Sequence, residues 1–173
     1  ILLIYGLFSF FKYNKVVEKG NSLTFNGFTF EVNEVYIINN DVRGNELPDG
    51  KHFLIVDANI TNNSFREGEK FSRGTVSINI GESDFYSSNK YENIVSDLGE
   101  LYTDRKIKLG DTINGLLVFE VPKNHLNSKM LLGVRNLDER KTVYINVNPI
   151  DLTKLKEKKV NLQLGSDSNL DDS

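Results

Sequence analysis

The sequence predicts an all-β fold, an antiparallel β-sandwich of about seven strands, and three observations support this. Apolar and polar residues alternate with a period of two in a series of short runs. Residues that favour turns, chiefly Asn, Gly, Pro and Asp, separate these runs. No long segment with helical periodicity lies between them, so parallel strand–helix–strand units are not expected. A length of 173 residues is enough for one domain with a single core.

The first runs form a predicted hairpin. An Asn-Gly dipeptide at 26–27 stands between two short apolar-polar alternations, which is the signature of a type I′ turn. Such a turn pairs Phe25 with Phe28 and Leu23 with Phe30, so all four side chains are expected on one face.

Longer strands follow the hairpin. Segment 32–38 has apolar residues at both parities, which predicts a bulge or burial on both faces. In the run from His52 to Thr61 the residues Leu54, Val56, Ala58 and Ile60 share one parity, with Asp57, Asn59 and Thr61 on the other, which predicts a core strand with one solvated face. The same alternation recurs in Val76–Ile80, Ile113–Val121, Met130–Val134 and Val143–Val147.

The N-terminal stretch predicts a membrane anchor. It has no charged residue before Lys12, and its large apolar side chains are Ile1, Leu2, Leu3, Ile4, Tyr5, Leu7, Phe8, Phe10 and Phe11. A full span needs about 20 apolar residues, so residues 1–19 are interpreted as a truncated transmembrane anchor with its juxtamembrane linker. No small-residue cleavage motif follows, which favours retention over a cleaved signal peptide. A first strand or helix buried in the domain is the other alternative.

The remaining chain divides into a domain and a tail. Residues 20–164 are assigned to the sandwich, with Asp151 as the N-cap of a short helix through Lys158 and a last strand over 160–164. Residues 165–173 are acidic and poor in apolar residues, which predicts a disordered tail.

Charge and composition exclude several classes of function. A net charge of -3 and interspersed basic residues argue against nucleic-acid binding. The absence of cysteine excludes disulfides, thiolate metal sites, a cysteine nucleophile and a lipid-modified cysteine in this sequence.

Candidates for chemistry are weak. The segment 44–52 differs from a phosphate-binding loop in glycine spacing, in its proline and in the histidine after its lysine. His52 and His125 are too few and too far apart in sequence for a zinc site. Asp97, Glu100 and Asp104 fall in the irregular stretch 86–108, where solvated carboxylates are the simpler interpretation than a calcium or acid-base site. No serine or metal-hydrolase motif is present, so no catalytic residue and no cofactor are expected.

Three tyrosines in or near the irregular stretch are candidates for partner binding. Tyr86, Tyr91 and Tyr102 could supply large, rigid and amphipathic contact area. The alternative is that they cover the edge of the sandwich.

Three segments carry a family resemblance. The run FLIVDANITNNS (53–64) is followed by KLGDTING (108–115) and LVFEVP (117–122). This pattern resembles the telokin-like, immunoglobulin-like domain of unknown function found in bacterial surface lipoproteins and exported proteins, over roughly residues 23–148. The resemblance implies an immunoglobulin-like sandwich in the cell envelope and no particular reaction. The chain departs from the family's common lipoprotein form because it has no cysteine after the apolar segment.

These observations lead to a functional hypothesis. The chain is expected to be a single-pass protein of the bacterial cell membrane, with an extracytoplasmic domain that binds another protein or a cell-surface polymer. The alternatives are a sensor or carrier of a small ligand or cation, and a hydrolase that uses the carboxylates of the irregular stretch.

Overall fold

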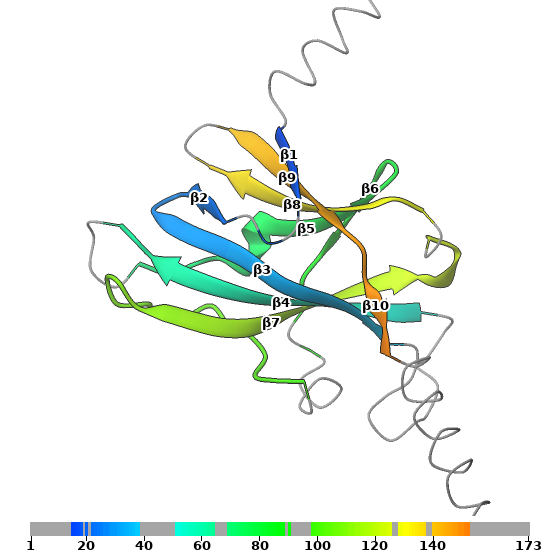
Figure 1. Cartoon of the computed structure of the whole chain (residues 1–173), viewed down its shortest axis with the longest axis horizontal. Coiled ribbons are helices and arrows are strands. Elements are labelled where there is room, and N and C mark those ends of the chain that lie inside the picture. Colours follow the sequence, from blue (N-terminus) through cyan, green and yellow to red (C-terminus); the bar gives the residue numbers. More distant parts are fainter. Residues whose placement is uncertain are drawn as a thin grey trace, which may run out of the picture.

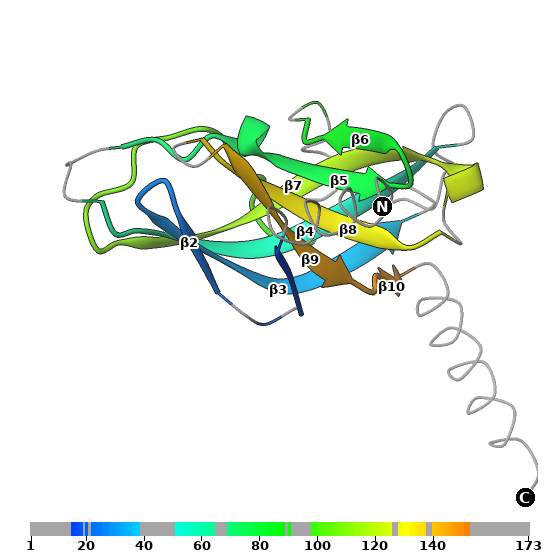
Figure 2. The same ribbon diagram turned by 90° about the horizontal axis from the view of Figure 1, so that it is seen from above.

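Two β-sheets stack face to face in a sandwich (Figures 1 and 2). The computed structural model describes residues 15–18, 20, 22–38, 51–64, 69–88, 90, 98–125, 128–137 and 140–152. The strands of this part are β1 (Lys15–Glu18), β2 (Leu23–Phe25), β3 (Phe28–Ile38), β4 (Lys51–Asn62), β5 (Val76–Ile80), β6 (Ser83–Tyr86), β7 (Thr112–Pro122), β8 (Met130–Asn136), β9 (Lys141–Val147) and β10 (Ile150–Asp151). Two 3₁₀ turns accompany them, η2 (Arg73–Thr75) and η3 (Lys123–His125).

The strand order defines two sheets. Sheet A has the order β1-β9-β8-β5-β6, and sheet B has the order β10-β3-β4-β7, with β2 also paired to β3. The pairs β1–β9 and β10–β3 are parallel, and the other pairs are antiparallel. The predicted all-β sandwich is therefore confirmed. Seven of these strands, β2 to β5 and β7 to β9, are the predicted ones, while β1, β6 and β10 were not predicted.

The hairpin and the bulge form as the sequence predicts. Asn26 and Gly27 have φ of 48° and 76°, as a type I′ turn requires, and Phe25 faces Phe28 across it. In β3 the register against β4 shifts between Val32 and Glu34, so one extra residue is inserted. This bulge moves the core-facing positions from even to odd numbers, which explains the apolar residues at both parities.

The core lies between the two sheets. The alternating residues of β4, β5, β7, β8 and β9 point inward and are buried. Phe71 enters from the segment before η2 and packs against the hairpin, with its ring stacked on Phe30 at a centroid distance of 5.7 Å and edge-on to Phe28 at 5.6 Å. One apolar cluster therefore joins both sheets and closes one end of the sandwich.

The outer face of sheet B corrects one prediction. The face of β4 opposite the core is not solvated throughout, because Phe53 and Ile55 are buried there in a second apolar cluster with Ile38, Leu101, Leu116 and Val118. The other half of this face is polar. Asp57 accepts hydrogen bonds from Asn33 and Asn114, at 3.1 and 2.6 Å. The alternation in the sequence predicted the polar half but did not show what covers the apolar half.

The irregular segment after residue 98 is tied to β7 and β4. Its backbone pairs with Leu116, which accepts from Tyr102 N and donates to Glu100 O, both at 2.9 Å. Gly115 allows this approach, because a Cβ there would lie 2.8 Å from the Cβ of Tyr102. Farther along, Gly110 N donates to the carbonyl of the buried Asn62 at 2.8 Å. The sequence segments that carry the family resemblance thus hydrogen-bond to one another.

Several sequence predictions concern the ends of the chain. Strand β1 lies in the stretch interpreted as a linker, so the sandwich starts upstream of Gly20. Asp151 ends β10, which pairs with β3 through Tyr36 and Ile37. The predicted anchor over 1–11, the rest of the helix through Lys158, the strand at 160–164 and the tail at 165–173 lie outside the described residues. Within the part that is described, no helix is long and apolar enough to cross a membrane.

Candidate functional site

The outer face of sheet A brings two tyrosines into one row. Tyr86 of β6 lies opposite Ser77 of β5, Ser77 lies opposite Gly133 of β8, and Gly133 lies opposite Tyr144 of β9. The neighbours of these residues along each strand point into the core, so this row faces outward. Strands in a sheet lie about 4.8 Å apart, which places the two tyrosine Cα atoms roughly 14 Å from each other.

Gly133 and Ser77 have small side chains, so the middle of the row stands lower than its two ends. A Cβ at Gly133 would lie 3.1 Å from Ser77 Oγ and 3.3 Å from Tyr144 Cε1, so the tyrosine ring leans over the glycine. Tyr86 at the other end is 60% exposed, although it is a large aromatic residue. The row therefore forms a shallow surface with a tyrosine at each end, which we call the tyrosine face.

Polar groups border the tyrosine face. In the next row, Asn79 Nδ2 donates to Asp84 Oδ1 at 3.1 Å, and this row continues through Leu131 to Asn146. Burial raises the pKa of Tyr144, and the nearby Asp84 and Tyr86 raise this pKa further. Tyr144 lies on β9, three strands away from β6 in sheet A, and is still affected electrostatically by these groups of β6.

The three tyrosines predicted as partner-binding residues have different outcomes. Tyr86 is exposed on the tyrosine face. Tyr91 lies outside the described residues. Tyr102 is 2% exposed, its hydroxyl donates to Phe71 O at 2.7 Å, and burial raises its pKa to about 12. Tyr102 is therefore a core residue and offers no surface to a partner, which corrects that prediction.

Sequence reasoning missed Tyr144, Ser77 and Gly133. The alternation in β9 already placed Tyr144 on the face opposite Val143 and Ile145. The sequence does not specify the order of the strands. Tyr86 and Tyr144 lie in one row only because β6 and β9 flank β5 and β8 in the sheet.

The carboxylates considered for chemistry lie apart from this face and beside arginines. Asp104 Oδ1 accepts from Arg73 N at 3.2 Å and lies 3.6 Å from Arg73 Nε. Glu100 Oε1 lies 3.6 Å from Arg105 Nη1, and Asp97 is outside the described residues. In the described ranges, no three His, Cys, Asp or Glu side chains gather in a way that could hold a metal ion.

The two histidines lie in different surroundings. His52 is buried at the start of β4, and its pKa is lowered by burial and by Lys123, against a smaller opposite effect of Asp151. His125 of η3 lies beside the ring of Phe85, with a centroid distance of 6.0 Å. The two belong to different environments, so they do not form a pair.

Comparisons with known proteins bear on the fold. No family model matches the chain, and no curated protein matches it by sequence. Among solved structures, the YjhA protein from Bacillus subtilis superposes with a TM-score of 0.58 at 12% identity, over 76% of this chain and 99% of that one. A functionally unknown protein from Listeria monocytogenes gives 0.55 at 19% identity, over 77% and 83%. The candidate lipoprotein YcdA from Bacillus subtilis gives 0.54 at 12% identity, over 75% of this chain and 38% of that one. At these identities the likeness establishes the fold, and the chain is similar to bacterial β-sandwich proteins of unknown function.

Proposed function

We propose that this protein is an immunoglobulin-like binding module of the bacterial cell envelope, rather than an enzyme, and that the tyrosine face binds a cell-surface polysaccharide. The strand order supports the immunoglobulin-like assignment. Strands β3-β4-β7 and β9-β8-β5-β6 follow the order A-B-E and G-F-C-C′ of such sandwiches. The envelope location is supported by the apolar residues 1–11 and by the similarity to candidate lipoproteins.

The tyrosine face is the observation that carries the proposed binding function. An aromatic ring at each end of a shallow row gives rigid apolar contact with polar hydroxyl tips, as Tyr86 and Tyr144 do here. Amide and carboxylate groups of Asn79 and Asp84 alongside can exchange hydrogen bonds with hydroxyl groups. A sugar ring has the matching character, since its C–H faces are apolar and its rim carries hydroxyls. A polysaccharide strand lying across β6 to β9 would meet both tyrosines.

Co-sedimentation with purified, protein-free cell walls tests this proposal. We expect Tyr86→Ala and Tyr144→Ala each to weaken binding by about tenfold, because large aromatic anchors carry most of the energy of such contacts. Leu109→Ala is the matched control, since Leu109 is 53% exposed but lies outside the tyrosine face. Binding that survives both tyrosine changes would contradict the assignment of the face. Binding to solubilised membrane proteins, with none to cell walls, would point to a protein partner instead.

Protease treatment of intact cells tests the proposed location. An extracytoplasmic domain is expected to be cleaved from outside, whereas a cytoplasmic domain is cleaved only after lysis. This result is independent of the binding assay, so the location and the tyrosine face can fail separately.

A further inference from the structure

Asp84 places a carboxylate beside the tyrosine face. It lies two residues before Tyr86 in β6, so both side chains project from the same face of sheet A. Its Oδ1 accepts a hydrogen bond from the neutral Asn79 at 3.1 Å. Asp84 is exposed, and in the part of the chain that the structure describes no ion pair involves it. Its negative charge is therefore available to a ligand of this face.

The charge of Asp84 acts across the tyrosine face. Burial raises the pKa of Tyr144 at the other end of the row, and Asp84 and Tyr86 raise this pKa further. The contribution of Asp84 means that its negative potential reaches the hydroxyl of Tyr144. The same potential favours a positive group that approaches the row.

Arg135 restricts where such a group can bind. It lies two residues after Gly133 in β8, opposite Thr142 of β9, and is exposed. Arg135 is thus next to the Tyr144 end of the row, whereas Asp84 is next to the Tyr86 end. A positive group is repelled at the first end and attracted at the second.

The ring of Tyr86 completes the site. Tyr86 is 60% exposed, so much of its ring is open to solvent. Aromatic rings attract a cation that comes within about 6 Å of the ring centroid. Because Asp84 and Tyr86 are two residues apart in a strand, their Cα atoms lie about 7 Å from each other. An ammonium group between the two side chains can contact both the ring and the carboxylate.

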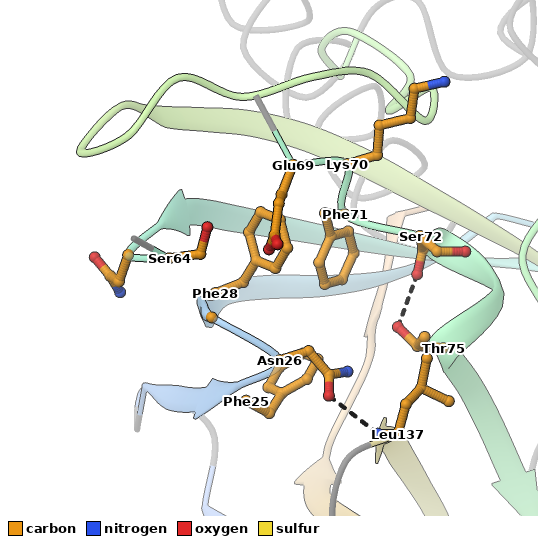
Figure 3. A pocket seen from close by; sticks show the side chains of 12 residues that line it. Phe25, Asn26, Phe28, Ser64, Glu69, Lys70, Phe71, Ser72, Thr75 and Leu137 are labelled. Atoms are coloured by element: carbon orange, nitrogen blue, oxygen red, sulfur yellow. Dashed lines mark hydrogen bonds between the residues drawn. The ribbon is translucent and has the colours of Figure 1, made fainter. Parts of the chain in front are cut away.

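The pocket at the β2–β3 turn does not offer this combination. Its volume is about 580 Å³, and Glu69 extends towards its phenylalanine rings while Lys70 points away from them (Figure 3). However, Phe25, Phe28 and Phe71 are core residues that are only 2 to 5% exposed, and Glu69 already has an interaction partner. A positive ligand is therefore better accommodated by the tyrosine face.

We propose that the polysaccharide bound by the tyrosine face carries free amino groups, and that Asp84 and the ring of Tyr86 bind one of its ammonium groups. This inference rests on the function proposed for the face and adds the class of sugar. An N-acetylated sugar has the same ring but no positive charge, so Asp84 distinguishes the two forms.

An NMR titration of the full chain with matched sugar oligomers tests the proposal. Hexamers of glucosamine and of N-acetylglucosamine have the same backbone and differ only in the acetyl groups. A mildly acidic buffer keeps the amino groups protonated. We expect the glucosamine hexamer to bind about tenfold more tightly, because a charge-assisted hydrogen bond to Asp84 forms only with an ammonium group. The shifted backbone amides should include those of Ser77, Asp84 and Gly133.

Variants separate the position of the charge from the net charge of the protein. Asp84→Asn is expected to remove most of the preference for glucosamine. Asp111→Asn is the matched control, because it removes the same charge from an exposed residue just before β7, outside the tyrosine face. Equal binding of the two hexamers, an equal loss of preference in both variants, or a lysine oligomer that binds as tightly as the glucosamine hexamer would overturn the proposal.

Co-sedimentation with cell walls keeps this proposal apart from the proposed function. If the protein sediments through Tyr86 and Tyr144 but shows no preference for glucosamine, only the preference for an amino sugar fails. If it neither sediments with cell walls nor binds either hexamer, the function proposed for the face fails as well.

Discussion

At the scale of single residues, Tyr102 shows how one side chain fixes a loop. Its ring packs edge-on against Phe71 at 5.7 Å, its hydroxyl donates to the carbonyl of Phe71, and its Cβ sits against Gly115. These contacts hold the irregular segment onto β7 and onto the segment that enters the core. The residue contributes to the fold, whereas Tyr86, the other predicted tyrosine that the structure describes, is exposed.

The pKa of Tyr102 leads to a prediction about alkaline stability. Burial raises this pKa to about 12 from the ordinary value of 10. The native state therefore keeps a proton that the unfolded state loses, so this contribution is fully present below pH 10 and is lost between pH 10 and 12. The loss amounts to about 2 to 3 kcal/mol of unfolding free energy.

Urea unfolding at several pH values, followed by circular dichroism, measures this effect. Tyr102→Phe is expected to be less stable at neutral pH by about 1 to 2 kcal/mol, because the Phe71 carbonyl loses its partner. Its stability should then fall less steeply between pH 10 and 12 than that of the unaltered chain. Tyr86→Phe is the control, since it removes the hydroxyl of an exposed tyrosine. Equal slopes in all three proteins would rule out a role for Tyr102.

At the scale of elements, Asn62 joins the end of β4 to the segment that leads into β7. Its side chain donates to Ile107 O at 2.8 Å and accepts from Ser64 N at 2.8 Å. Its backbone bonds Gly110 N and Asp111 O. The residue is fully buried, so water cannot replace these bonds. These bonds explain why an asparagine stands at position 62, near the end of the FLIVDANITNNS run.

Replacing Asn62 with alanine should therefore be costly. We expect Asn62→Ala to lower the unfolding free energy by about 2 to 4 kcal/mol, because a buried donor and a buried acceptor lose their partners. The adjacent Asn63→Ala is the matched control and should cost less than about 1 kcal/mol, since Asn63 is exposed. Equal costs for the two changes, measured by urea unfolding, would show that the buried bonds do not hold the loop.

The elements differ in how far the sequence predicts them. The long strands, the type I′ turn and the bulge in β3 follow from side-chain periodicity and from Asn26-Gly27, which are local features. Strands β6 and β10 are four and two residues long, too short for a period to emerge. The pairing of residues 100–102 with β7 rests on backbone groups, which leave no pattern in the sequence. The tyrosine face was hidden for a related reason, since it combines residues from strands whose order the sequence does not specify.

At the scale of the whole molecule, the two sheets are joined by one core and by a polar contact at its end. The main apolar cluster contains residues of both sheets, so the sandwich is expected to unfold as a unit. Asn26 adds a direct link, because it belongs to the β2–β3 turn of sheet B and bonds backbone groups at the end of β8 in sheet A.

The link through Asn26 can be removed without disturbing the turn. Glycine tolerates the positive φ of this position, so Asn26→Gly deletes the two inter-sheet hydrogen bonds and keeps the type I′ geometry. We expect a loss of about 1 kcal/mol in unfolding free energy and faster hydrogen exchange at the amide of Leu137, which loses its acceptor. Asn26→Asp retains an acceptor oxygen and should preserve the protection of that amide better than glycine does. If exchange at Leu137 were the same in all three proteins, the contact between the turn and β8 would not link the two sheets in solution, and the core alone would hold them together.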